Sequence, residues 1–314
     1  MISLGCTKYI KFSRTKLNPF KMKLLRFILM TMCLFQTNMF LSQVKPAYII
    51  YTANGKKTTF EKLVDASENK ELVLFGEFHD NPISHWLQLE LTKEMYGEVG
   101  SNLQLGFEMF EQDQQELLSQ YLTGKLSDKQ FKDTMRLWPN YETDYAPIVD
   151  FAKKNKLFCV ASNVQRKYAS LLFKKGRKAL DTLSLTIKSQ MAPIDFIVDI
   201  TLSQYREVFT MGGHMGVNMG MNMVESQAFK DATMAQFIMA NPGRKEGSVH
   251  LHFNGAFHSD FYQGILWYVQ QKQPGIRVLT ISTVTQEDVR KLDKEHFGRA
   301  DFIICVPESM TKTH

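Results

Sequence analysis

The residues best suited to chemistry lie in two short segments with the same spacing. Residues 76–79 read GEFH and residues 255–258 read GAFH, so both are G-x-x-H. Each segment follows an apolar run and precedes an apolar pattern of helical period, which predicts a buried parallel strand, a loop and a helix. Because parallel strands end at one edge of a sheet, we expect His79 and His258 to meet there.

Two carboxylates accompany these histidines. Glu77 lies within the first segment, and Glu108 follows the apolar run 103–107. Two imidazoles with a carboxylate form a ligand set for Zn²⁺, Mn²⁺ or Fe²⁺, so His79, His258 and Glu77 are the predicted metal ligands. Without a metal, the predicted catalytic set Glu77, His79, Glu108 and His258 suits general acid–base chemistry. The structural alternative is that the histidines cap helices and bond to loop carbonyls.

An aromatic loop over residues 138–145 offers a different kind of site. Trp138, Tyr141 and Tyr145 could form a flat apolar wall, and a tyrosine can ligate haem iron. The alternative is ordinary aromatic packing where a helix begins. Asn163 and Arg166 follow the apolar run 157–161, so we expect them at the same sheet edge as the G-x-x-H segments.

A methionine-rich segment, residues 211–223, surrounds His214. Thioethers suit Cu(I) or the edge of a haem, and His214 is a predicted haem contact. We favour a simpler interpretation, in which a glycine-broken apolar segment packs in the core or closes over a large apolar ligand. Asp231, on the helix that follows, points either to the same crevice or to solvent. His250 and His252 share one face of a strand.

The pattern of elements predicts an α/β fold with a mostly parallel central sheet flanked by helices. Apolar runs predict strands at 71–75, 103–107, 157–161, 249–253, 276–282 and 302–306, and residues 47–60 predict a hairpin that turns at Asn54-Gly55. Between about residues 185 and 240 the alternation stops, which predicts a helical insertion or subdomain. Cys159 and Cys305 lie in predicted strands, and we expect buried thiols, with a disulfide as the alternative.

The first 42 residues read as a secretory signal peptide, leaving residues 43–314 as a single domain. They hold seven of the 38 Lys and Arg residues and no acid, followed by an apolar run over 27–41. Met22 is an alternative start, and a lipoprotein anchored through Cys33 is a less favoured alternative. Without the leader the chain is nearly neutral, which removes the main support for nucleic acid binding.

Taken in linear order, these motifs resemble the ChaN-like haem-binding uptake proteins of the Tiki, TraB and erythromycin-esterase-like superfamily. The resemblance covers nearly the whole chain after the leader and rests on residues 76–82, 106–111, 138–148, 161–166 and 231–235. It implies an exported, often iron-regulated α/β protein that binds haem through a tyrosine, sometimes with haems stacked between the protomers of a dimer. In hydrolase relatives the functional glutamate and histidines match Glu77, His79 and His258.

The sequence therefore predicts an exported haem-binding protein of iron uptake, with its ligand in the crevice at the carboxyl ends of the strands. We expect it in the periplasm or on the periplasmic side of a membrane. Its expected partners are haem, an outer-membrane haem or iron receptor, and a second copy of the chain. The alternative is a metal-dependent protease or esterase that uses the two G-x-x-H loops. A third hypothesis is a metal-free esterase with His79 as the base.

Overall fold

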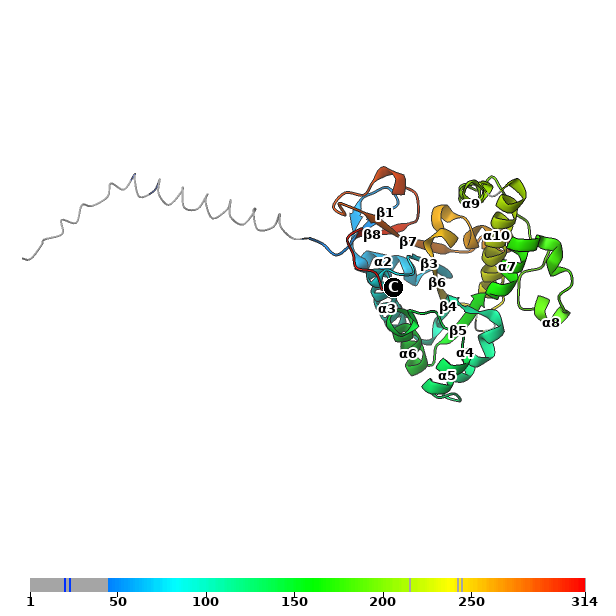
Figure 1. Cartoon of the computed structure of the whole chain (residues 1–314). Coiled ribbons are helices and arrows are strands. Elements are labelled where there is room, and N and C mark those ends of the chain that lie inside the picture. Colours follow the sequence, from blue (N-terminus) through cyan, green and yellow to red (C-terminus); the bar gives the residue numbers. More distant parts are fainter. Residues whose placement is uncertain are drawn as a thin grey trace, which may run out of the picture. The chain divides into compact units, whose positions relative to one another are not determined.

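The computed structural model describes residues 20, 23, 45–214, 216–241, 243 and 245–313. The predicted signal peptide, residues 1–42, lies outside the described residues apart from Phe20 and Lys23. Residues Ala47–His314 form one compact unit around a sheet (Figure 1). The strands of this sheet are β1 (Ile49–Thr52), β2 (Lys57–Thr58), β3 (Leu72–Glu77), β4 (Leu103–Glu111), β5 (Phe158–Asn163), β6 (Val249–Gly255), β7 (Val278–Gln286) and β8 (Phe302–Pro307).

The sheet is mostly parallel, with the strand order β2-β1-β8-β7-β3-β6-β4-β5. Strands β3 to β8 pair in parallel, whereas β1 is antiparallel to both β2 and β8. The predicted hairpin is confirmed, and its turn places Gly55 at a φ of 74°, a conformation that glycine adopts without strain. The predicted α/β fold class is therefore correct.

Helices cover both faces of the sheet, which is why its central strands read as continuous apolar runs. Side chains alternate between the two faces: Val73 and Phe75 of β3 belong to one core cluster, and Leu72 and Leu74 to another. The first cluster packs beneath α2 (Phe60–Glu68), α3 (Pro82–Val99), α4 (Gln115–Leu122), α5 (Asp128–Thr134), the π-helical turn η3 (Tyr141–Tyr145) and α6 (Ala146–Asn155).

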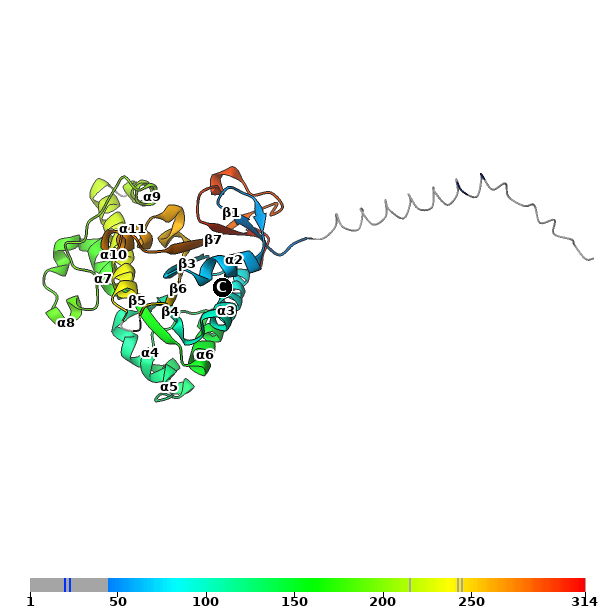
Figure 2. The same ribbon diagram turned by 180° about the vertical axis from the view of Figure 1, so that it is seen from behind.

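The second cluster lies under helices that gather on the opposite side of the sheet in both views (Figures 1 and 2). They are α7 (Arg166–Lys175), α8 (Leu185–Lys188), α9 (Ser203–Gly213), α10 (Val217–Met239) and α11 (Ile265–Lys272). Helices α8, α9 and α10 form the predicted helical segment. The long helix α10 packs against α7, α9, α11 and β5, so it holds this layer together.

Short 3-10 turns complete the chain. They are η1 (Gly100–Asn102), η2 (Gln112–Gln114), η4 (Arg177–Leu180), η5 (Ala256–His258), η6 (Asp260–Tyr262) and η7 (Lys294–His296). Cys159 and Cys305 are buried and free, as expected for small apolar side chains. Within the part of the chain that is described, no helix has the length and apolar character needed to cross a bilayer.

Candidate functional site

The two G-x-x-H segments meet because their strands are neighbours. β6 lies between β3 and β4 in the sheet, and Glu77 at the end of β3 pairs in register with Gly255 at the end of β6. β4 runs alongside β6 on its other side, with Phe107 opposite Phe253. Glu108, the next residue of β4, therefore lies near the end of β6. Three neighbouring parallel strands thus bring Glu77, Gly255 and Glu108 to one edge of the sheet.

Both glycines of the motifs stand where a side chain would collide with the other loop. A Cβ at Gly76 would lie 2.8 Å from Cα of Ala256 and 3.0 Å from the carbonyl oxygen of Ile281. A Cβ at Gly255 would lie 2.9 Å from Cε1 of the His79 ring. Glycine at these positions therefore allows the two loops, and the His79 ring, to approach closely.

Glu77 and His79 form the first pair at this edge. Nδ1 of His79 lies 2.8 Å from Oε1 of Glu77, and the His79 ring meets Trp138 edge-on with ring centroids 4.7 Å apart. Burial opposes the charged imidazolium, but the hydrogen bond to Glu77 and the charge of Glu108 raise the pKa of His79 above its ordinary value. A buried carboxylate thus orients a histidine whose side chain is 40 % exposed.

Several buried groups hold the Glu77 carboxylate in place. The hydroxyl of Tyr145 donates to Oε1 at 2.6 Å, and the side-chain amide of Gln88 donates to Oε2. Nδ1 of His85 lies 3.5 Å from the same Oε2. Burial alone would raise the pKa of Glu77, but His85 and the hydrogen bonds from His79 and Tyr145 lower it below its ordinary value. Glu77 is therefore a fixed anion.

Glu108, His258 and Asp231 form the second group. Nε2 of His258 lies 3.2 Å from Oε1 of Glu108, and Nδ1 of His258 is hydrogen-bonded to Asp231. The backbone N–H of Gly255 donates to Glu108 at 2.7 Å, and the hydroxyl of Tyr205 donates to Asp231 at 2.8 Å. Burial opposes ionisation, but the two carboxylates raise the pKa of His258 to about 10. The ring is therefore a buried imidazolium between two anions.

Because of this charge arrangement, we expect the stability of the fold to be highest within a pH window and to fall on both its acid and its alkaline side. The pKa of His258 is raised from 6.5 to about 10, so its contribution is complete below pH 6.5 and is lost as the pH rises toward 10. Burial opposes ionisation of Glu108, but His258 lowers the pKa of Glu108 from 4.5, so the contribution of Glu108 is complete above pH 4.5 and is lost in acid. The urea midpoint should therefore be highest between about pH 4.5 and 6.5. A midpoint that stays constant from pH 6.5 to 9 would contradict the buried imidazolium.

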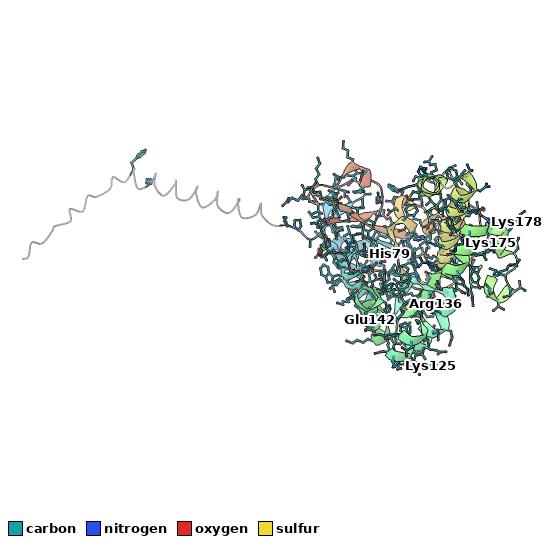
Figure 3. The ribbon with its side chains drawn as sticks, viewed as in Figure 1. His79, Lys125, Arg136, Glu142, Lys175 and Lys178 are labelled. Atoms are coloured by element: carbon teal, nitrogen blue, oxygen red, sulfur yellow. The ribbon has the colours of Figure 1, made fainter. Side chains whose placement is uncertain are left out.

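A cavity of about 560 Å³ opens beside these two groups. Its walls come from α7, α9 and α10, and its floor comes from the two G-x-x-H loops. Figure 3 shows His79 near the centre of the folded unit, whereas Lys175 and Lys178 lie at its outer edge. The lining residues are Glu77, Phe78, His79, Arg166, Ala169, Ser170, Phe173, Val208, Met211, Met223, Ser226, Gln227, Lys230, Gly255, Ala256, Phe257 and His258.

The aromatic loop lies elsewhere. Tyr141 and Tyr145 belong to the turn η3 and are buried in the first core cluster, so neither lines the cavity. Burial raises the pKa of both phenols, and the charge of Glu77 raises that of Tyr145 further. Trp138 packs on the same cluster and against His79. This placement gives no support to a phenolate ligand from the loop.

The remaining predicted contacts are scattered. Arg166 begins α7 and lines the cavity, whereas Asn163 ends β5 outside it, with its amide oxygen buried and without a hydrogen-bond partner among the described residues. His214 is exposed just after α9 and does not line the cavity. His250 and His252 are buried side by side in β6, where burial lowers the pKa of His252 to about 4.

The methionine-rich segment is mostly helical and includes the start of α10. Met211 and Met223 contribute to the cavity wall, and Met223 packs against the second core cluster. This placement agrees with the interpretation that the segment packs in the core and around a cavity, rather than with a cluster of thioether ligands.

No group of three or more His, Cys, Asp or Glu side chains among the described residues is arranged to hold a metal ion. Of the predicted ligands, His258 has both ring nitrogens engaged with carboxylates, and Glu77 is engaged by three donors. His79 keeps one nitrogen, Nε2, without a hydrogen-bond partner in the described part of the chain.

Three groups of the site did not follow from the motifs. His85 and Gln88 lie on α3 and both face Glu77. Their spacing of three residues, with the N-cap Asn81 four residues before His85, places them on one face of the helix, which is the signal that sequence reasoning could have used. Asp231 was a candidate, but nothing in the sequence paired it with His258.

The fold and the site define a class: an α/β protein with a cavity at the carboxyl edge of its sheet, floored by two carboxylate–histidine groups. The chain belongs to the family of haem-binding uptake proteins of the Tiki superfamily, ChaN, which it matches over residues 63–269. The resemblance inferred from the motifs is thereby confirmed. No curated protein matches the chain significantly.

The fold is shared by a solved structure. ChaN of Campylobacter jejuni, described with cofacial haem binding, superimposes with a TM-score of 0.62 at 17 % identity, covering 82 % of this chain and 96 % of that chain. A protein from Bacillus cereus gives 0.46 at 11 % identity, covering 82 % and 93 %. A mutant erythromycin esterase in its open conformation gives 0.43 at 11 % identity, covering 75 % and 77 %. At TM-scores below 0.5, the last two likenesses say nothing further about this chain.

Proposed function

We propose that the protein binds haem in the cavity between the two G-x-x-H loops and helices α7, α9 and α10. The observation that carries this proposal is the cavity itself, together with membership of a haem-binding uptake family. Its volume of about 560 Å³ is within the range of about 300–1,000 Å³ typical of ligand pockets.

The lining suits a large flat ligand with an apolar body and acidic groups. Phe173, Val208 and Met223 contribute apolar surface, and a histidine lies on the floor. Arg166 and Lys230 are cations of the lining that can pair with the two propionates. When bound, the haem would supply an iron centre, and these residues would hold its body and its carboxylates.

We also propose where the protein acts and in which process. The basic and apolar pattern of residues 1–42 supports export to the periplasm, with the protein free or membrane-associated on that side. Family membership supports a role in haem or iron uptake. We further propose an outer-membrane receptor as the source or acceptor of haem, and a homodimer of this chain.

A bulky side chain in the cavity should test this location. Ser170→Trp places an indole among the lining residues of α7, so the dissociation constant for haem should rise at least about 10-fold because the ligand loses its space. The matched control is Ser101→Trp, at an exposed position in η1. Absorbance titrations of both variants measure the constants. Equal affinity in the two variants would place the haem elsewhere.

A hydrolase is the second candidate, because a carboxylate-oriented histidine faces a cavity. Glu77 holds Nδ1 of His79 at 2.8 Å, which suits His79 to act as a general base through Nε2. The metal-dependent form has less support, because two of its three predicted ligands are already engaged. Hydrolysis would be lost on changing Glu77 to Gln, whereas haem binding would survive.

A further inference from the structure

We propose that residues 308–313, the segment after β8, form a strap that positions the first G-x-x-H loop. The strap acts through the buried carboxylate of Asp144, and it holds the main chain of His79 in the floor of the cavity. The inference goes beyond the proposed function, because it concerns the shape of the site and not the ligand that occupies it.

The strap leads from the end of β8 to the loop that follows β3. Its start still follows the sheet, because the backbone N–H of Glu308 donates to the carbonyl oxygen of Gln286 at 3.1 Å. The N–H of Met310 then donates to the carbonyl oxygen of Pro307 at 2.9 Å, which turns the chain away from the strand. In both views this stretch runs from β8 to a point beside α3 (Figures 1 and 2).

Three contacts join the strap to its surroundings. Nζ of Lys312 lies 2.6 Å from Oδ2 of Asp80, and the backbone N–H of Thr313 donates to the carbonyl oxygen of Asp80 at 3.0 Å. The hydroxyl of Thr313 donates to Oδ2 of Asp144, in the turn η3, at 2.8 Å. Lys312 is 67 % exposed, so its ion pair contributes little, whereas Asp144 is buried. The hydrogen bond from Thr313 to Asp144 is therefore the main attachment of the strap.

Two further side chains connect Asp144 to the main chain of His79. The side-chain amide of Asn140 donates to Asp144 at 2.6 Å and to the carbonyl oxygen of His79 at 2.8 Å. Nε2 of His85 lies 3.1 Å from the same carbonyl oxygen and 3.5 Å from Oδ2 of Asp144. Asp144, Asn140 and His85 are all buried, so a hydrogen bond lost among them has a desolvation cost. The position of His79 thus depends on a network that includes Thr313.

The network also reaches the floor of the cavity. The ring of His85 faces both halves of the first pair, because its Nδ1 lies 3.5 Å from Oε2 of Glu77. Phe78, between Glu77 and His79, lines the main cavity and also a smaller cavity of about 290 Å³ between the strap and the loop. A shift of the strap therefore changes the position of residues that line the main cavity.

The test is Thr313→Val in the chain from residue 43 onward, which removes the hydroxyl and keeps the shape of the side chain. The amide of Asn81 donates to the carbonyl oxygen of Phe78 at 3.0 Å within the loop. It should exchange with deuterium about 10-fold faster in the variant, because the loop opens more often. The nuclear magnetic resonance signals of the His79 ring, which meets Trp138 edge-on, should shift.

Two matched variants complete the experiment. Thr313→Ser keeps the hydroxyl and should restore both the slow exchange of Asn81 and the His79 signals. Thr123→Val removes a hydroxyl that donates to backbone carbonyls of α4, and it should change neither readout. Circular dichroism of each variant shows whether the fold is retained.

Two outcomes would overturn the strap. In the first, Thr313→Val leaves the exchange of Asn81 and the His79 signals as they are in the unmodified protein. In the second, Thr313→Ser or Thr123→Val changes them as much as Thr313→Val does, which would show a general loosening of the fold. Neither readout needs a ligand, so a failure of haem to bind would remove the proposed function and leave this inference standing.

Discussion

Asp231→Ala is expected to lower the free energy of unfolding by about 3–5 kcal/mol, because it breaks a buried ion pair from one side. The carboxylate of Asp231 accepts from Nδ1 of His258 and from the hydroxyl of Tyr205, and all three groups are buried. The substitution leaves Nδ1–H of His258 and the hydroxyl of Tyr205 without their acceptor in the core, while Nε2 of His258 still faces Glu108. Each lost acceptor has a desolvation cost.

The control for this prediction is Asp133→Ala. Asp133 also pairs with a cation, Lys129, but its side chain is 59 % exposed, and surface pairs of this kind contribute about 0–1 kcal/mol. Urea unfolding of both variants near pH 6 measures the difference. If Asp231→Ala costs no more than Asp133→Ala, the buried charge group does not exist as described.

Glu77→Ala should have a comparable effect on stability, about 3–5 kcal/mol, measured by urea unfolding. It removes the acceptor of three donors, His79, Tyr145 and Gln88. Because the side-chain amide of Gln88 then has no acceptor in the core, much of the loss comes from unpaired polar groups rather than from packing.

The conservative variant Glu77→Gln separates the two functional proposals. Its amide oxygen can still accept from His79 and the rest of the cavity lining is unchanged, so haem should still bind. A hydrolase dependent on the Glu77–His79 pair would lose its activity in this variant. Glu142→Gln, a 61 % exposed glutamate labelled in Figure 3, is the matched control and should change neither property. Haem binding abolished by Glu77→Gln, with normal folding, would contradict this expectation.

The strands of the sheet could be predicted because burial on both faces leaves a local signal in the sequence. Strands buried on both faces must be apolar throughout, so β3 and β6 stand out in the sequence, and each ends abruptly at a polar loop. The rule that parallel strands open at one edge then places the two loops together. In the structure β3, β6 and β4 are neighbours in the sheet, so the ends of these strands lie together as expected.

The partners of each site residue could not be predicted, because they depend on how helices face the sheet. Asp231 and His258 are 27 residues apart, and only the packing of α10 against α9 and α11 brings them together. The aromatic loop shows the same limit. The aromatic composition of the loop suggested that Tyr145 forms a flat wall for a ligand. In the structure the turn η3 places Tyr145 in the core, where its hydroxyl donates to Glu77.

The central claim is that this chain binds haem at one site, and a haem titration of the purified chain from residue 43 onward tests it most directly. We predict a Soret band that saturates at one haem per chain, with the metal content of the unloaded protein measured by mass spectrometry on the same sample. A titration without a saturable band, accompanied by one tightly held zinc, manganese or non-haem iron ion per chain, would contradict the account and make the G-x-x-H loops a hydrolase centre.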